Sequence, residues 1–266
     1  EVINPRANEE LDNRMAYGDE FFQLRMRHGL TAREGERLMR QRNYYGAMMV
    51  RTGRADALIS GLTRTYPSVI RPALQVIGKA DDAEKVAGMY ILETKRGPMF
   101  FADTTVNLNP TAEEIASIAV LTARAVRSLR IVPRIALLSY SNFGSARGVD
   151  AEKMAEAARI LKEKHPDLIV DGEIQANFAL NDELLSESFP FSTLHEKRVN
   201  TLIFPNLASG NIAYKLLQEM AGIEVQGPIL LGMRKSFHVL QMGSSVREIH
   251  DMVRLAVVDA QNKKDA

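Results

Sequence analysis

The residues of this chain that suit anion chemistry gather in the stretch 227–248. An apolar run at 229–231 is followed by a basic pair, Arg234 and Lys235, and then by a helix whose start is marked by Ser245. A helix N-terminus offers unpaired N–H groups and a positive dipole end, which suit an anion. The order of strand, basic loop and helix therefore indicates an anion site, although any α/β protein contains several such turns.

Composition argues against several other kinds of site. The 266 residues include no Cys, which excludes disulfides, thiolate metal sites and Cys nucleophiles. The five histidines show no metal-ligand spacing, so we predict no metal in this chain. A net charge of +1 gives no reason to expect a nucleic-acid or membrane partner. No glycine-rich dinucleotide fingerprint follows a strand.

The overall balance of residues is that of a soluble globular protein. The chain is 45% hydrophobic and 25% charged, enough for one large domain or two smaller ones. No apolar run approaches the roughly 20 residues that cross a bilayer, and no signal peptide is present, so we expect a cytoplasmic protein. The polar start at Glu1, without Met, suggests part of a longer polypeptide.

Apolar strands alternate with amphipathic helices along the chain. Capping boxes are expected at Thr31 and Thr111, and the runs 86–92 and 99–102 indicate a hairpin. Pro72 is expected in the first turn of a helix. Seven strands are predicted, at 56–60, 86–92, 99–102, 135–139, 168–170, 201–204 and 229–231. This alternation predicts an α/β fold with a mainly parallel, helix-covered sheet.

Six sequence blocks, in order, resemble those of the phosphotransacetylases, the phosphate acetyl- and butyryltransferases. They are DALISG at 56–61, RPALQ at 71–75, DTTVNLNP at 103–110, LLSYSNFGS at 137–145, FPNLASGN at 204–211 and the block that starts with Gly227-Pro228. The resemblance implies two three-layer αβα lobes with an interlobe cleft. Residues 1–75 with 230–266 would form a first lobe truncated at its N-terminal side, and residues 76–229 the second.

The departures from the family pattern bear on activity. Gln241 and Met242 stand where the family has its catalytic Ser-Arg pair, and His238 and Val239 stand where it has Asn-Asp. This change and the sequence at 141–145 are most similar to the C-terminal domain of hybrid NADP-dependent malic enzymes, which binds acetyl-CoA as a regulatory ligand. NADP and a divalent metal would then belong to a malic-enzyme domain outside these residues, and no residue here would be catalytic.

Seven residues are predicted to bind acetyl-CoA: Arg25, Arg71, Ser139, Asn142, Lys235, His238 and Gln241. The counterparts of Arg25 and Arg71 contact CoA in the family, and a guanidinium fork suits phosphate. All of these except Gln241 also have a structural interpretation. The arginines and Lys235 would be solvated surface charges, Ser139 and Asn142 turn residues, and His238 a polar loop residue without a carboxylate partner. Glu248 stands where the family has a helping acid, but its spacing from Ser245 favours a helix cap, and Met242 would fill the core.

Three functions remain open at this point. The first is a regulatory acetyl-CoA-binding domain attached to a malic enzyme, with little transferase activity of its own. The alternative is an active phosphate acetyltransferase that interconverts acetyl-CoA and acetyl phosphate. The third is a structural module that assembles a homo-oligomer, a dimer or higher, since the family dimerises.

Overall fold

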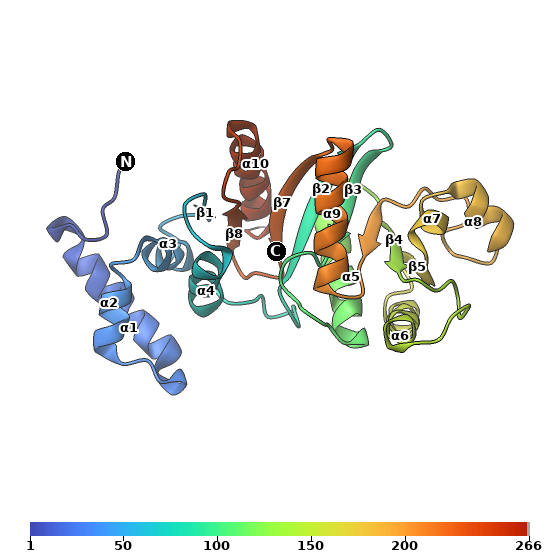
Figure 1. Ribbon diagram of the computed structural model, residues 1–266. Helices are drawn as coiled ribbons and strands as arrows, with labels where there is room; N and C mark the ends of the chain where they lie inside the picture. Colours follow the sequence, from blue (N-terminus) through green and yellow to red (C-terminus); the bar gives the residue numbers. More distant parts are fainter. Residues whose placement is uncertain (265–266) are drawn as a thin grey trace. The chain divides into compact units, whose positions relative to one another are not determined.

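The computed structural model describes residues 1–264 (Figure 1). The chain forms two compact units, one of residues 1–81 with the chain from Met233 onward, and one of residues 82–232. The sequence predicts the crossings near residues 76 and 229, and the structure crosses slightly later, after Asp81 and Gly232. Within residues 1–264, no helix has the length and apolar character that crossing a membrane requires.

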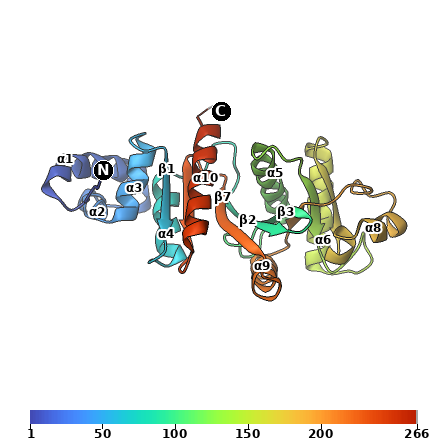
Figure 2. The ribbon, with the colours of Figure 1, turned by 90° about the horizontal axis from the view of Figure 1, so that it is seen from above.

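The first unit is built on a two-stranded parallel sheet. Strands β1 (Ala57–Gly61) and β8 (Ser236–Leu240) pair from Ala57 opposite Ser236 to Gly61 opposite Leu240. Strand β8 is not among the strands predicted from the sequence. The longer helices of this unit are α1 (Leu11–Arg25), α2 (Ala32–Leu38), α3 (Arg42–Arg51), α4 (Tyr66–Val76) and α10 (Val246–Asn262). Helix α3 packs against β1, and α10 packs against both strands (Figure 2).

Helix α4 begins earlier than predicted. Pro67 lies at its start and Pro72 in its interior, so the prediction that Pro72 opens a helix was wrong. An interior proline donates no hydrogen bond to the carbonyl four residues before it, which here is Ser68. The Asn43 side chain donates to that carbonyl instead, at 3.3 Å. The side chain of Asn43, which is distant in the sequence, therefore replaces the backbone hydrogen bond that α4 lacks at Pro72.

The second unit contains a six-stranded mixed sheet in the order β5-β4-β6-β3-β2-β7. Its strands are β2 (Ala87–Thr94), β3 (Gly97–Ala102), β4 (Arg134–Leu138), β5 (Ile169–Ile174), β6 (Thr201–Ile203) and β7 (Glu224–Leu231). The pairs β5–β4, β4–β6 and β6–β3 are parallel, whereas β3–β2 and β2–β7 are antiparallel. The fold is thus α/β with mainly parallel pairing, as the sequence predicts.

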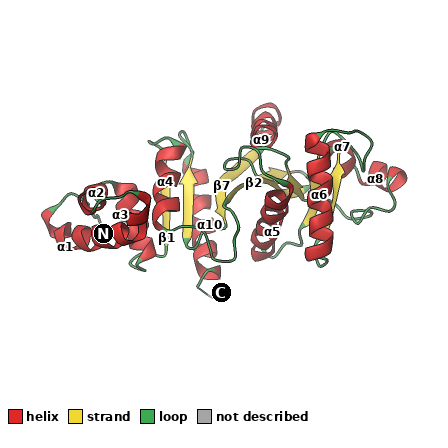
Figure 3. Cartoon of the chain, turned by 90° about the horizontal axis from the view of Figure 1, so that it is seen from below, coloured by secondary structure: helices red, strands yellow, loops and turns green. Residues whose placement is uncertain are grey.

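Helices cover both faces of this sheet. They are α5 (Ala112–Ser128), α6 (Val149–Lys164), α7 (Ala176–Ala179), α8 (Asp182–Ser188) and α9 (Leu207–Ala221). Helix α5 lies on one face and α9 on the other, which makes the second unit a three-layer structure (Figures 2 and 3). The buried core lies between these layers, where the rings of Tyr90 and Tyr214 stack with centroids 4.1 Å apart.

Strand β5 extends beyond the strand that the sequence predicts at 168–170. Asp171, Gly172 and Glu173 lie within β5, and the Asp171 and Glu173 side chains are buried. Gly172 has φ +153°, and a Cβ there would lie 2.7 Å from the Leu137 carbonyl oxygen. The register between β4 and β5 shifts at this point. The glycine therefore marks an irregularity inside the strand, where the backbones approach closely, and not a strand end.

Candidate anion-binding site at the carboxyl ends of β1 and β8

The carboxyl ends of β1 and β8 meet at one edge of the small sheet. Gly61, the last residue of β1, has φ +138°, and a Cβ there would lie 2.0 Å from the Leu240 carbonyl oxygen. The loops 62–65 and 241–245 leave from this edge and lead into α4 and α10. In open α/β sheets ligands bind outside the carboxyl ends of the strands. We call this region the carboxyl-edge site.

Asn43 fixes the starts of two helices at this edge. Its Oδ1 accepts a hydrogen bond from Ser60 Oγ at 2.7 Å, and its Nδ2 donates to the Ser68 carbonyl at 3.3 Å. Ser60 is near the end of β1, and Ser68 is in the first turn of α4. One amide side chain therefore ties the start of α3 to the strand end and to the next helix.

Three arginines lie in the segments that meet at this edge. Arg42 is the first residue of α3, Arg64 lies in the loop after β1, and Arg71 lies in the second turn of α4. In the part of the chain that the structure describes, none of them forms an ion pair with Asp or Glu. Unpaired guanidiniums offer a planar fork of donors that matches phosphate oxygens. The edge can therefore take an anionic ligand.

Arg25 and Arg71 both lie near the Tyr44 phenol. Tyr44 is buried, and its hydroxyl donates to Gln75 Oε1 at 2.6 Å. Burial raises the pKa of Tyr44, and the positive charges of Arg71 and Arg25 act in the opposite direction. Both guanidiniums are thus close enough to affect the same ring. Arg25 is the last residue of α1 and Arg71 lies in α4, so charges from two helices act on the Tyr44 phenol.

The loop after β8 carries the residues that replace the Ser-Arg pair of the family pattern. The Gln241 side chain is a neutral amide, and the Met242 side chain is 69% exposed, so the prediction that Met242 fills the core was wrong. Methionine offers no hydrogen-bond donor, and an amide is a poor proton acceptor. Glu248 accepts from the Ser245 amide at 2.6 Å, which confirms the predicted capping box. At Gln241 and Met242 the edge thus offers neither a charged donor nor a strong base.

His238 is not a loop residue, contrary to the prediction. It lies in the middle of β8 and is fully buried, with Nε2 3.3 Å from Asp259 Oδ2 and 3.2 Å from Ser236 Oγ. Its Nδ1 atom has no hydrogen-bond partner. The expectation that it lacks a carboxylate partner was also wrong, because Asp259 comes from α10, which packs across β8. This imidazole has no solvent-exposed surface with which to meet a ligand.

The Asp259 carboxyl group makes the stability of the folded chain depend on pH in acidic solution. Burial acts to raise its pKa, but the hydrogen bond from His238 and the charges of Lys263 and His238 outweigh burial and lower the pKa from 3.8 to about 2. A carboxyl group with a lowered folded-state pKa stabilises the fold above its unfolded pKa and loses that effect as the pH falls. Between about pH 4 and pH 2 we expect a loss of about 2 kcal/mol from this group.

Urea unfolding of the native chain and of Asp259→Asn, from pH 5 to pH 2, tests this expectation. Asparagine cannot titrate, so the stability gap between the two proteins should shrink by about 2 kcal/mol over that range. A gap that stays constant would show that Asp259 has an ordinary pKa in the folded chain.

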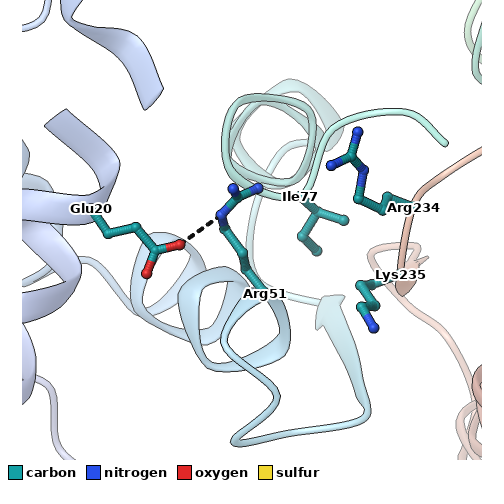
Figure 4. A pocket seen from close by; sticks show the side chains of 5 residues that line it. All are labelled: Glu20, Arg51, Ile77, Arg234 and Lys235. Atoms are coloured by element: carbon teal, nitrogen blue, oxygen red, sulfur yellow. Dashed lines mark hydrogen bonds and ion pairs between the residues drawn. The ribbon is translucent and has the colours of Figure 1, made fainter. Parts of the chain in front are cut away.

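Lys235 lies at the opposite edge of the small sheet. It immediately precedes β8, at the amino end of the strand, whereas Gln241 immediately follows the carboxyl end. There Lys235 lines a hollow together with Glu20, Arg51, Ile77 and Arg234 (Figure 4). It does not join Arg71 and Gln241 in the carboxyl-edge site.

Ser139 and Asn142 belong to the second unit, where their side chains hold a loop. Ser139 Oγ accepts from the Ser141 amide at 3.2 Å, and Asn142 Oδ1 accepts from the Gln175 amide at 2.8 Å. Buried Glu173 accepts from Ser141 Oγ at 2.8 Å and from the Gly144 amide at 2.6 Å. These bonds order the loop after β4, which is the turn chemistry that we weighed against ligand binding.

Arg42, Arg64 and Glu173 are not among the site residues predicted from the sequence. Arg64 could have been found, because it lies in a loop directly after a predicted strand. Arg42 could not, since its position depends on the contacts of Asn43 with two distant segments. Over residues 1–264, no group of three or more His, Asp or Glu side chains is arranged to hold a metal ion.

Comparison with known proteins identifies the family. The family model described as "Phosphate acetyl/butaryl transferase" matches residues 1–257. The chain belongs to this family. A crystal structure of a phosphotransacetylase from Streptococcus pyogenes superposes with a TM-score of 0.86 at 32% identity, over 99% of this chain and 78% of that one.

Curated relatives are of two kinds. A phosphate acetyltransferase from Clostridium acetobutylicum is 35% identical over 98% of this chain and 79% of its own length. An NADP-dependent malic enzyme from Salmonella typhimurium is 40% identical over 96% of this chain. The chain spans only 34% of the length of that malic enzyme. Both kinds of relative match nearly the whole of this chain. Only the chemistry of the site can therefore indicate which kind this chain resembles in function.

Proposed function

We propose that this chain binds acetyl-CoA as a regulatory ligand at the carboxyl-edge site and catalyses acetyl transfer at no more than a background rate. Arg25 and Arg71 would hold phosphate groups of the ligand, and Arg42 and Arg64 would add to the positive field. Gln241 would lie near the acyl end. The observation that carries the proposal is the combination of unpaired arginines with Gln241 and Met242 on the same edge.

The chemistry of acetyl transfer gives the reason for low turnover. Attack of phosphate on the thioester creates a tetrahedral oxyanion, which needs a hydrogen-bond donor or a cation beside it. Loss of the CoA thiolate needs help with a proton. Gln241 and Met242 supply neither a charged donor nor a base. The loss of one such donor raises the barrier by about 3 to 4 kcal/mol.

Regulation would act on an attached malic-enzyme domain. A ligand shifts an equilibrium between two arrangements only by its different affinity for each. The similarity to malic enzymes over almost all of this chain supports such an attachment. The malic domain would contribute the NADP and divalent-metal sites and the oxidative decarboxylation of malate, and the whole polypeptide would assemble as a homo-oligomer in the cytoplasm.

Changing Arg71 to Ala should weaken acetyl-CoA binding about tenfold or more, because a charge-assisted hydrogen bond contributes about 1.5 to 3 kcal/mol. Isothermal titration calorimetry on the folded chain measures the affinity. Arg37→Ala is the matched control, since Arg37 is exposed on α2 beside Glu34, and it should bind as the native chain does. Equal affinity for Arg71→Ala and the native chain would refute the assignment of this site.

An active phosphate acetyltransferase is the second candidate. Two relatives named phosphate acetyltransferase are 35% and 37% identical over 98% of this chain, which favours a shared activity. A coupled assay for acetyl phosphate made from acetyl-CoA and phosphate separates the two candidates. Sustained turnover by the native chain would establish the enzyme, and binding without turnover would establish the sensor. A folded chain that binds no acetyl-CoA would leave the structural oligomerisation module.

A further inference from the structure

A small hollow lies at the amino ends of β1 and β8, and we call it the amino-edge pocket. Its volume is about 170 Å³, and it is lined by Glu20, Arg51, Ile77, Arg234 and Lys235 (Figure 4). All five residues belong to the first unit. They come from α1, from the end of α3, from the residue after α4 and from the segment before β8. The pocket is therefore formed by four separate segments of one compact unit.

The amino-edge pocket is separate from the carboxyl-edge site. Lys235 and Gln241 lie at opposite ends of β8. A strand rises about 3.3 Å per residue, so the two positions are about 20 Å apart. Arg51 belongs to the same end as Lys235, because its Nη1 donates to the Val76 carbonyl at 3.0 Å, where α4 ends. A group bound in one site does not touch the other.

Charge in the pocket is predominantly positive. Arg51 Nε donates to Glu20 Oε1 at 2.9 Å, and Arg234 Nη2 donates to Asp81 Oδ1 at 2.5 Å. Lys235 forms no ion pair with a carboxylate of residues 1–264, so the lining contains three cations and one acid, Glu20, while Asp81 contacts Arg234 from outside the lining. The Asp81 side chain is 90% exposed. An exposed ion pair is weak, and its arginine can exchange the carboxylate for a ligand.

The residue types of the amino-edge pocket suit a small anion with more than one charge. In Figure 4, Ile77 lies between Arg51 and Arg234, and the Lys235 ammonium points away from the Arg234 guanidinium. Arginine forks match the oxygens of a phosphate, and the flexible lysine stem lets its ammonium turn toward a bound charge. A phosphate or diphosphate group fits a hollow of about 170 Å³. We propose that the amino-edge pocket binds inorganic phosphate or diphosphate independently of the carboxyl-edge site.

Methyl NMR locates the binding directly. With pyrophosphate added to the folded chain at constant ionic strength, the Ile77 methyl signals should shift and saturate, with a Kd of about 1 mM or below. Ile70 is the internal control, because it is buried in α4, the helix that ends just before Ile77, and does not line the pocket. Inorganic phosphate should give the same pattern more weakly. Shifts at both residues alike, or at neither, would overturn the proposal.

Variants and a second ligand complete the test. Arg234→Gln with Lys235→Gln should weaken the pyrophosphate response of Ile77 at least tenfold, whereas the control Arg37→Gln should leave it unchanged. Circular dichroism checks that each variant is folded. Saturating acetyl-CoA should leave the pyrophosphate affinity as it was. If acetyl-CoA abolishes the Ile77 response, or if the double variant binds like the native chain, the amino-edge pocket is not an independent phosphate site.

Discussion

Replacing Gln241 with Ser and Met242 with Arg in one chain should raise the rate of acetyl phosphate formation about a hundredfold or more. The serine returns a hydroxyl that can exchange a proton with the departing thiolate, and the arginine returns a charged donor for the oxyanion. Removal of a single oxyanion donor lowers kcat about 100- to 1000-fold in enzymes of acyl transfer. Both positions follow β8 at the exposed edge of the small sheet, so the new side chains need no repacking of the core.

The measurement is the initial rate of acetyl phosphate formation with acetyl-CoA and phosphate both saturating. Met220→Arg serves as the matched control, because it places the same new charge on another exposed methionine, 82% exposed on α9. That control should keep the native background rate. A double variant that binds acetyl-CoA and turns over no faster than the native chain would show that Gln241 and Met242 do not limit acetyl transfer.

Gly61→Ala should lower the free energy of unfolding by about 3 kcal/mol or more. This is the largest loss of stability that we predict for one added methyl group. The alanine Cβ would lie 2.0 Å from the Leu240 carbonyl oxygen, and φ is +138°, where an L-residue is strained. The backbones of β1 and β8 must then separate at the carboxyl-edge site. Acetyl-CoA affinity should fall together with stability.

Gly53→Ala is a control that introduces backbone strain like that of Gly61→Ala but no steric clash. Gly53 has φ +80°, and nothing lies within 4 Å of a Cβ placed there. Its cost should be about 1 kcal/mol, since only the left-handed conformation is penalised. Urea unfolding of both variants and of the native chain measures the difference. Equal costs for the two substitutions would show that the strands at Gly61 relax without loss.

Local signals in the sequence were reliable. The predicted capping boxes at Thr31, Thr111 and Ser245 are all confirmed, each with the hydroxyl bonded to the amide three residues later. The hairpin of β2 and β3 is confirmed as well. A cap or a hairpin turn depends on residues only a few positions apart, so the sequence contains everything that determines it.

Features that depend on distant segments could not be read from the sequence. Pro72 breaks the local rule for helices, and only the side chain of Asn43 compensates for it. The strand β8 is short, and a histidine in it favoured the prediction of a loop. The structure shows that His238 is buried beside Asp259 of α10, a partner that is distant in the sequence. Arg25 and Arg71 were predicted as ligands from the family resemblance. The position of Lys235 at the other edge of the small sheet could be learned only from the structure.

The small parallel sheet also has a consequence for the order of folding. Strands β1 and β8 pair although the whole second unit lies between them in the chain. Contacts between distant segments form slowly, because a long loop must close first. During synthesis the second unit can fold from its own continuous segment. Strand β1 cannot pair until β8 has also emerged from the ribosome. Until then β1 has no partner strand, and the carboxyl-edge site does not exist. Under the proposed function, only chains whose synthesis has passed β8 would bind acetyl-CoA at this site.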